Sequence, residues 1–427
     1  MASTLLKSAS LSLLVALFGC SEPASEQTPL ENTAGVSLSN IKQHIKTLAS
    51  DDFEGRGPLT HGEVKTVGYL SEQYKALGLT GAYKGKYLQP VKMAMVTANQ
   101  DMQLKVGDLS FESGKDFTAR TEQLQPLIDV RNSDVVFAGY GINAPEYNWN
   151  DYKNIDVTGK TVVVLVNDPG FATQNDALFT GNAMTYYGRW TYKYEEAARQ
   201  GAKAVFIVHE TAPAAYPWGV VESSNTGTKY TLMDNNLNAS KLPVMGWLTL
   251  DATEQMFNAA KLNYQDLKQA ALNDDFKATP LNLKANLAFK NEVSHAKSHN
   301  VVAQITGSES PEEYVVISAH WDHFGTKQTD TGPKIYNGAV DNASGTAATL
   351  EIARIMSEMN KQKPFKRSII FANFTAEETG LIGSEEFASG AVVPTKQMVG
   401  LLNIDGMNVL DGTDYILQYG KDLSTME

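Results

Sequence analysis

Acidic and histidine side chains gather at four points in the last third of the chain, three of them at the ends of apolar runs. EYVVIS leads into AHWDHFG, RSIIFANFT into AEETG and MVGLLNI into DG, and a further aspartate lies in the turn NGAVDNASG. The residues are His320, Asp322, His323, Asp341, Glu377, Glu378 and Asp405. Carboxylates packed together repel and raise one another's pKa, so such a cluster is costly unless cations lie among them.

The residue types indicate both the metal and the reaction. An imidazole with several carboxylates and no thiolate suits zinc, with manganese or cobalt as alternatives. A carboxylate shared by two ions would bridge them at about 3.5–4 Å, and water bound there loses its proton near neutral pH. The resulting hydroxide is a nucleophile, so the sequence predicts a two-metal hydrolase centre.

The hydrophobic pattern predicts the elements that must position these residues. Short continuous apolar runs separated by helical segments indicate a parallel sheet that is buried on both faces. Such sheets bind ligands beyond the carboxyl ends of their strands, so the polar residues after the runs should converge. Gly338 and Asn342 open a turn before TAATLEIARIM, whose periodicity predicts a helix that starts near Ser344.

Four motifs, in this order, carry a resemblance to a known family. AHWDHFG, NGAVDNASG, AEETGLIGS and NIDG resemble the co-catalytic zinc aminopeptidases of peptidase clan MH, a family that also holds glutamate carboxypeptidase. Upstream, LASDDFEGRGPLTHGE and VVFAGYGINAPEYNWNDYKNIDVTGKTVVV resemble bacterial members with an inserted protease-associated domain. The likeness covers most of the chain after about Ser37.

The resemblance implies an α/β fold, in which a mixed, mostly parallel central sheet is flanked by helices and a β-rich protease-associated domain is inserted. Within the inserted part, short β runs alternate with turns and one helix, YKYEEAARQGA. The expected divisions are a lipoprotein signal peptide (1–19), a disordered tether (20–37), a first part of the peptidase domain (38–129), the inserted domain (130–288) and an incomplete second part of the peptidase domain (289–427).

The family's metal ligands carry over onto this chain residue by residue. The resemblance implies two zinc ions, with His320 as a ligand of one ion, Asp341 as the bridging carboxylate, and Glu378 and Asp405 as terminal ligands. The family's second ion also needs a histidine from a loop further along, and no histidine follows His323. The second zinc site is therefore expected to be incomplete, and the chain to be truncated at its C-terminus.

The catalytic roles carry over in the same way. Glu377 becomes the general base that moves a proton from water to the leaving amine. Asp322 is expected to orient His320 through a hydrogen bond to its free ring nitrogen. The family also implies a cis peptide bond at Asp341–Asn342. His323 is the alternative ligand to His320, which the motif favours.

Other motifs favour less specific interpretations. FEGRGP could lie near the site, but it is interpreted as a connector only, because Gly-Pro loops usually link elements. His295 and His299 are four residues apart, but they precede a β-branched run and are interpreted as structural. The net charge of −12 and the lack of a long basic run make nucleic acid an unlikely partner.

The N-terminus has the pattern of an export signal. One lysine in MASTLLKSAS precedes the short apolar run LSLLVALF and then Cys20, the only cysteine. This pattern resembles a bacterial lipoprotein signal that is cut before Cys20, whose sulfur is then acylated. We therefore expect an exported protein, periplasmic or anchored to the outer membrane, that meets a membrane only through this lipid.

Together these observations predict an exported zinc aminopeptidase acting on peptides with a free N-terminus. The alternatives are a carboxypeptidase or an aminoacyl cyclase on the same scaffold, or a receptor-like binding protein without activity. Carboxypeptidase action would require cationic groups for the substrate's carboxylate, and the sequence does not locate them.

Overall fold

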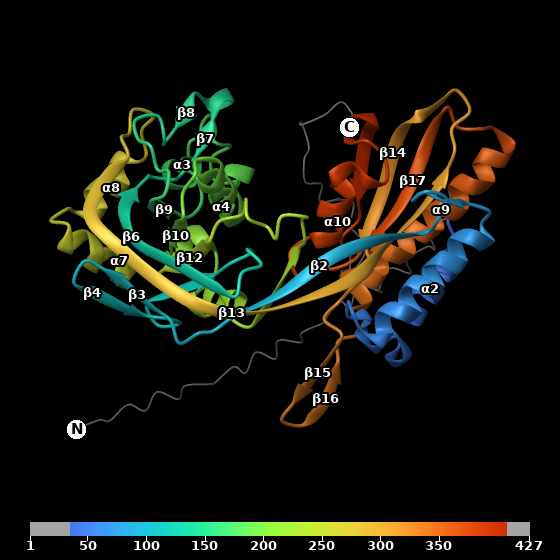
Figure 1. Ribbon diagram of the computed structural model, residues 1–427. Helices are drawn as coiled ribbons and strands as arrows, with labels where there is room; N and C mark the ends of the chain where they lie inside the picture. Colours follow the sequence, from blue (N-terminus) through green and yellow to red (C-terminus); the bar gives the residue numbers. More distant parts are fainter. Residues whose placement is uncertain (1–34, 408–427) are drawn as a thin grey trace, which may run out of the picture.

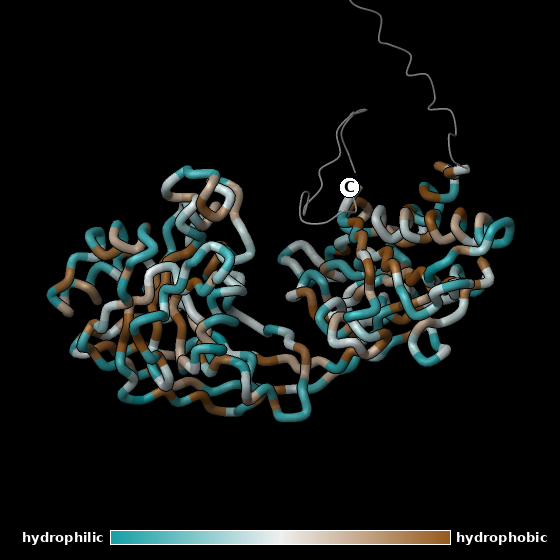
Figure 2. The backbone as a smooth tube through the Cα atoms, turned by 90° about the horizontal axis from the view of Figure 1, so that it is seen from above, coloured by the Kyte–Doolittle hydropathy of each residue, from teal (hydrophilic) through white to brown (hydrophobic). Residues whose placement is uncertain are grey.

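The structure, a computed structural model, describes residues 35–407. Figure 1 shows two lobes joined by the 27-residue strand β13 (Thr279–Ile305), which runs through both. We call residues 35–97 and 290–407 the site lobe and residues 98–289 the distal lobe. Figure 2 shows apolar segments running through the interior of both lobes. No helix within 35–407 combines the length and hydropathy needed to cross a membrane.

The sheet of the site lobe places three parallel strands side by side. In spatial order these are β18 (Met398–Asn403), β14 (Ser310–His320) and β17 (Arg367–Phe374), followed by the antiparallel β13. The three apolar runs of the sequence are these strands, as predicted. Since His320 pairs with Phe374 and Ser318 with Asn403, the carboxyl ends of all three strands meet at one edge.

Helices cover both faces of this sheet. Alternate residues of each strand point to opposite faces and therefore pack against different helices. Ile369 and Phe371 of β17 pack in one core with α2 (His61–Ala76) and α9 (Gly345–Gln362). Ile370 and Ala372 pack on the other face with Phe387, which follows α10 (Ile382–Glu386). The helix predicted near Ser344 is α9, and the predicted α/β fold with a mixed, mostly parallel sheet flanked by helices is confirmed.

The remaining elements of the site lobe are shorter, and one of them, strand β2, runs beside β13. They are α1 (Leu38–Leu48), β1 (Thr80–Gly81), β2 (Leu88–Ala98) and the hairpin β15 (Thr326–Thr329) and β16 (Gly332–Ile335). Helix α1 begins after Ser37, whose side chain caps it.

The distal lobe is built on four parallel strands with an antiparallel strand at the edge. These are β6 (Leu127–Phe137), β9 (Thr161–Leu165), β10 (Ala204–Val208), β12 (Val244–Leu248) and the edge strand β5 (Phe117–Arg120). Shorter strands are β3 (Gln103–Val106), β4 (Leu109–Glu112), β7 (Asn143–Ala144) and β8 (Trp149–Asn150). Buried apolar residues from Ala98 to Phe289 share one core.

The expectation of one helix in the inserted region is wrong. The predicted helix is α4 (Trp190–Arg199), but five others accompany it: α3 (Pro169–Thr173), α5 (Thr211–Ala214), α6 (Trp218–Asn225), α7 (Leu250–Ala259) and α8 (Tyr264–Ala270). In α7 the apolar stripe is brief, yet Thr249 caps its first turn and Met256 and Phe257 are buried. The divisions at residues 130 and 288 and the protease-associated identity stay predictions. The signal peptide, Cys20 and residues 20–34 of the expected tether precede the described residues, whereas Ser37, its last residue, caps α1 and is not part of a tether.

One strand of the distal segment reaches across to the site lobe. Strand β11 (Thr228–Leu232) pairs with β2, and its Tyr230 and Leu232 pack near Ala376 and Ile382. The second lobe thus contacts the segment that carries the two candidate glutamates.

Candidate metal centre

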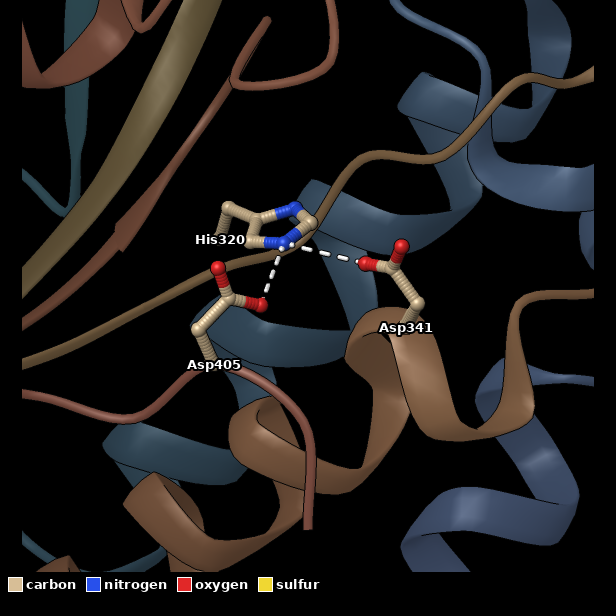
Figure 3. Close-up of side chains that lie close together, drawn as sticks. All are labelled: His320, Asp341 and Asp405. Atoms are coloured by element: carbon tan, nitrogen blue, oxygen red, sulfur yellow. Dashed lines mark hydrogen bonds and ion pairs between the residues drawn. The ribbon is translucent and has the colours of Figure 1, made fainter. Parts of the chain in front are cut away.

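Three of the predicted ligands meet at the carboxyl ends of β14 and β18 (Figure 3). His320, the last residue of β14, is 2% exposed, and its Nε2 lies 3.2 Å from Asp341 Oδ1 and 3.2 Å from Asp405 Oδ1. The potential ligand atoms of these three residues all lie within 4.8 Å of one another. The predicted convergence is therefore present, although the residues are far apart in the sequence.

A second group of potential ligands shares Asp341 with the first. His323, Asp341 and Glu378 also offer ligand atoms within 4.8 Å of one another, and His323 Nδ1 lies 2.6 Å from Glu378 Oε1. Asp341 thus occupies the position between two groups that a bridging carboxylate requires. The sequence interpretation set His323 aside in favour of His320, whereas the structure gives each histidine its own set of carboxylates.

Asp322 holds the site together in a way that the sequence did not indicate. Nδ1 of His320 lies 3.1 Å from the main-chain oxygen of Asp322 and 3.6 Å from its carboxylate, so the main-chain oxygen is the closer acceptor. The fully buried carboxylate instead accepts hydrogen bonds from the main-chain N–H groups of Glu377, at 3.0 Å, and Glu378, at 3.4 Å. Asp322 therefore links the β14 end to the turn after β17.

The Asp341 segment is tied to the Asp405 segment by Asn342. The Asp341–Asn342 peptide bond is cis, as the family resemblance implied. The buried Asn342 side chain donates to the carbonyl of Ile404 and accepts from the N–H of Gly345 and, at 3.2 Å, from the N–H of Gly406. These bonds fix the two segments that carry carboxylates on either side of His320.

Strand β13 fixes the turn that carries Glu377. Asn300 accepts a hydrogen bond from the N–H of Thr375 and donates to the carbonyl of Gly383, so it closes the turn between β17 and α10. Glu377 itself reaches toward the first group, with Oε2 3.9 Å from His320 Nε2. It lies beside the potential ligands without belonging to either group within the described part of the chain.

The electrostatics of the site reflect crowded carboxylates. The pKa of Glu377 is raised to about 7, chiefly by burial and also by Asp322, Asp405 and Glu378, while His320 opposes the shift. Burial alone would lower the pKa of His320, but Asp322, Glu377 and Asp405 outweigh it and raise this pKa to about 9. A proton on His320 thus supplies positive charge that a metal ion would replace.

The donor set fits zinc. If Nδ1–H of His320 donates to the Asp322 carbonyl, Nε2 keeps its lone pair toward two carboxylates, which is the arrangement of a metal-bound histidine. Asp341 and Asp405 are about half exposed, so an ion can reach them from solvent. Imidazole and carboxylate groups without thiolate are ligands that zinc accepts.

Zinc binding is expected to release a proton from His320. A histidine must be neutral to coordinate a metal, and the pKa of this group is raised to about 9. At pH 7.5 close to one proton should therefore leave the group on binding, and affinity should rise by up to about tenfold per pH unit as the pH approaches 9. Calorimetric titration in buffers of different ionisation enthalpy measures this proton, and binding without release would contradict the protonated state of His320.

Comparison with known proteins finds a family match over the part of the chain that carries the site. Residues 300–427 match the family described as Peptidase family M28. Aminopeptidase NAALADL1 of Mus musculus is 30% identical over 167 residues, 36% of this chain and 21% of that protein. Probable glutamate carboxypeptidase LAMP1 of Arabidopsis thaliana is 37% identical over 123 residues, 28% of this chain and 16% of that protein.

A solved structure, the aminopeptidase from Aneurinibacillus sp. strain AM-1, is 23% identical with a TM-score of 0.43, covering 87% of this chain and 70% of that one. The match to the curated relatives spans about a fifth of their length or less. The family match covers the strands and turns that carry both groups of potential ligands, and it confirms the resemblance to a zinc-peptidase family. Residues 300–427 of this chain are therefore similar to Peptidase family M28.

Proposed function

We propose that this chain is a zinc-dependent aminopeptidase, which removes residues from the free N-terminus of peptides. The observation that carries the proposal is the sharing of Asp341 by two groups, each with its own histidine and a further carboxylate. A pair of ions in such a site acts as a Lewis acid toward a carbonyl and lowers the pKa of water. The match to a peptidase family supports peptides as the substrates.

The residues would divide the work between holding the ions and moving a proton. His320, Asp341 and Asp405 would hold one zinc ion, and His323, Asp341 and Glu378 the other. Glu377 takes a proton from the attacking water on its carboxylate and gives it to the departing amine. A pKa raised to about 7 suits this role, because the group can both accept and return a proton near neutral pH. The exposed carboxylate edge of Asp341 and Asp405 favours a substrate that brings an ammonium group.

A carboxypeptidase is the second candidate, and one observation favours it. The hairpin between His323 and Asp341 presents two lysines beside the site. Lys327 Nζ lies 4.7 Å from the centre of the Phe324 ring, which is 4.7 Å from the His323 ring. Lys334 lies over Tyr336 on the same hairpin. Ammonium groups held there could bind a substrate's terminal carboxylate.

Replacing the general base should separate metal binding from turnover. Glu377→Gln keeps the shape of the side chain but cannot accept a proton, so turnover should fall by about 10²–10⁴. The zinc content, measured by mass spectrometry of the metal, should equal that of the parent because Glu377 is not among the proposed ligands. Full activity in this variant would contradict the assignment.

The same assay distinguishes the two exopeptidase types. The parent is offered peptides with a free amino end and an amidated carboxyl end, and peptides with an acetylated amino end and a free carboxyl end. Cleavage of the first set alone is expected for the aminopeptidase. Cleavage of the second set alone would establish the carboxypeptidase instead.

His323 should be needed for the second ion. His323→Ala removes the imidazole of one group and leaves the other intact, so the zinc content after dialysis should fall from two ions per chain to one. His295→Ala is the matched control, because this exposed histidine on β13 lies in the site lobe outside both groups. Two ions retained by the His323 variant would show that another group completes the site.

We further propose that the chain is exported as a lipoprotein, on the pattern that ends in Cys20. This segment precedes the described residues. Expression in a Gram-negative bacterium with radiolabelled palmitate should label the parent chain and leave Cys20→Ser unlabelled. Equal labelling of both forms would exclude acylation at this sulfur.

A further inference from the structure

The side chain of Arg56 is fully buried at the base of the site, in the FEGRGP segment that the sequence interpretation took for a connector. It ends the short helical segment Asp51–Arg56, and its φ of 51° lies in the left-handed region. A buried guanidinium is costly unless its donors are satisfied, because burial removes its hydration. Here its hydrogen bonds go to main-chain carbonyls.

Three of those four carbonyls belong to the segments that carry the proposed ligands, and the fourth ends α1. Nε donates to the carbonyl of Trp321, between His320 and Asp322, at 2.9 Å. Nη1 donates to the carbonyls of Leu48 and Asn337, and Nη2 to that of Gly338, each at 2.7 Å. One planar group thus joins the end of α1, the turn after β14 and the turn that leads to Asp341.

The main chain of the same loop adds two contacts of its own. The carbonyl of Arg56 accepts from the N–H of His323 at 3.3 Å, and the carbonyl of Gly55 accepts from the N–H of Gly325 at 3.0 Å. Gly55 has a φ of 67°, and a Cβ there would lie 2.4 Å from the carbonyl oxygen of Tyr336. The loop is therefore fitted closely around the base of the β15–β16 hairpin.

We propose that Arg56 is a positioning residue that sets the spacing between the turn after β14, which carries both histidines, and the turn that leads to Asp341, and so the affinity for both metal ions. The inference rests on the proposed metal-dependent function. Its physical basis is twofold. The rigid fork of the guanidinium holds carbonyls of both turns at fixed angles, which a lysine cannot do. Its fixed charge also attracts Asp322, Asp341 and Glu378, which otherwise repel one another.

The test compares Arg56→Gln and Arg56→Lys with a control of similar instability. Ile370→Ala truncates a fully buried side chain of β17 on the far face of the sheet, so it should lower Tm without touching the loop. Zinc affinity is measured by competition with a fluorescent chelator, and Tm is measured with and without zinc.

Arg56→Gln is expected to weaken zinc binding by about 10–100-fold, as loss of groups that orient metal ligands usually does. Arg56→Lys should recover part of this loss, because it restores the charge but not the fork. Ile370→Ala should bind zinc like the parent despite its lower Tm. Parent-like zinc affinity in Arg56→Gln, with only Tm reduced, would overturn the proposal and leave Arg56 a structural residue.

A measurement on the parent chain serves if the variants do not fold. Zinc should slow amide hydrogen exchange in residues 51–57, which supply no ligand, because the loop is bonded to the turns that do. Unchanged exchange in this loop while zinc binds would overturn the role of Arg56 and leave the proposed function intact. A parent chain that binds no zinc would overturn both.

Discussion

Repulsion between carboxylates is the constraint on which the site depends. Asp341 lies between two histidines and faces further carboxylates from the turn after β17 and the end of β18. The raised pKa of His320 and the attraction of the buried Arg56 guanidinium both reflect this charge. The arrangement suits cations. Buried hydrogen bonds of Asp322, Asn342 and Asn300 hold the segments that carry the carboxylates in place.

The parallel strands explain how residues so far apart in sequence meet. Each parallel strand ends at the same edge, so a short turn after each one suffices to bring a side chain into the site. The turns are then locked by side chains that are buried and fully hydrogen-bonded, which leaves little freedom for the ligands. The half-exposed edge of the site is formed by Asp341 and Asp405, while the histidine between them is enclosed.

The sequence was sufficient to predict the strands and the first metal group, because both rest on local signals. Apolar runs marked β14, β17 and β18, and the polar residues at their ends were visible directly. Arg56 was not predictable, since its partners are main-chain carbonyls, three of them more than 260 residues away, and carbonyls leave no trace in the sequence. The role of His323 was not predictable either, because it depends on the turn that lies opposite, which carries Glu378. Helix α7 was missed because its apolar stripe is only a few residues long.

Strand β13 has a mechanical consequence. It runs as one strand through both lobes, and Asn300 near its end closes the turn that carries Glu377. A rotation of the distal lobe about β13 would be transmitted along the paired strands β13 and β2 to that turn. The distal lobe is therefore joined through β13 to the turn that carries Glu377, the proposed general base.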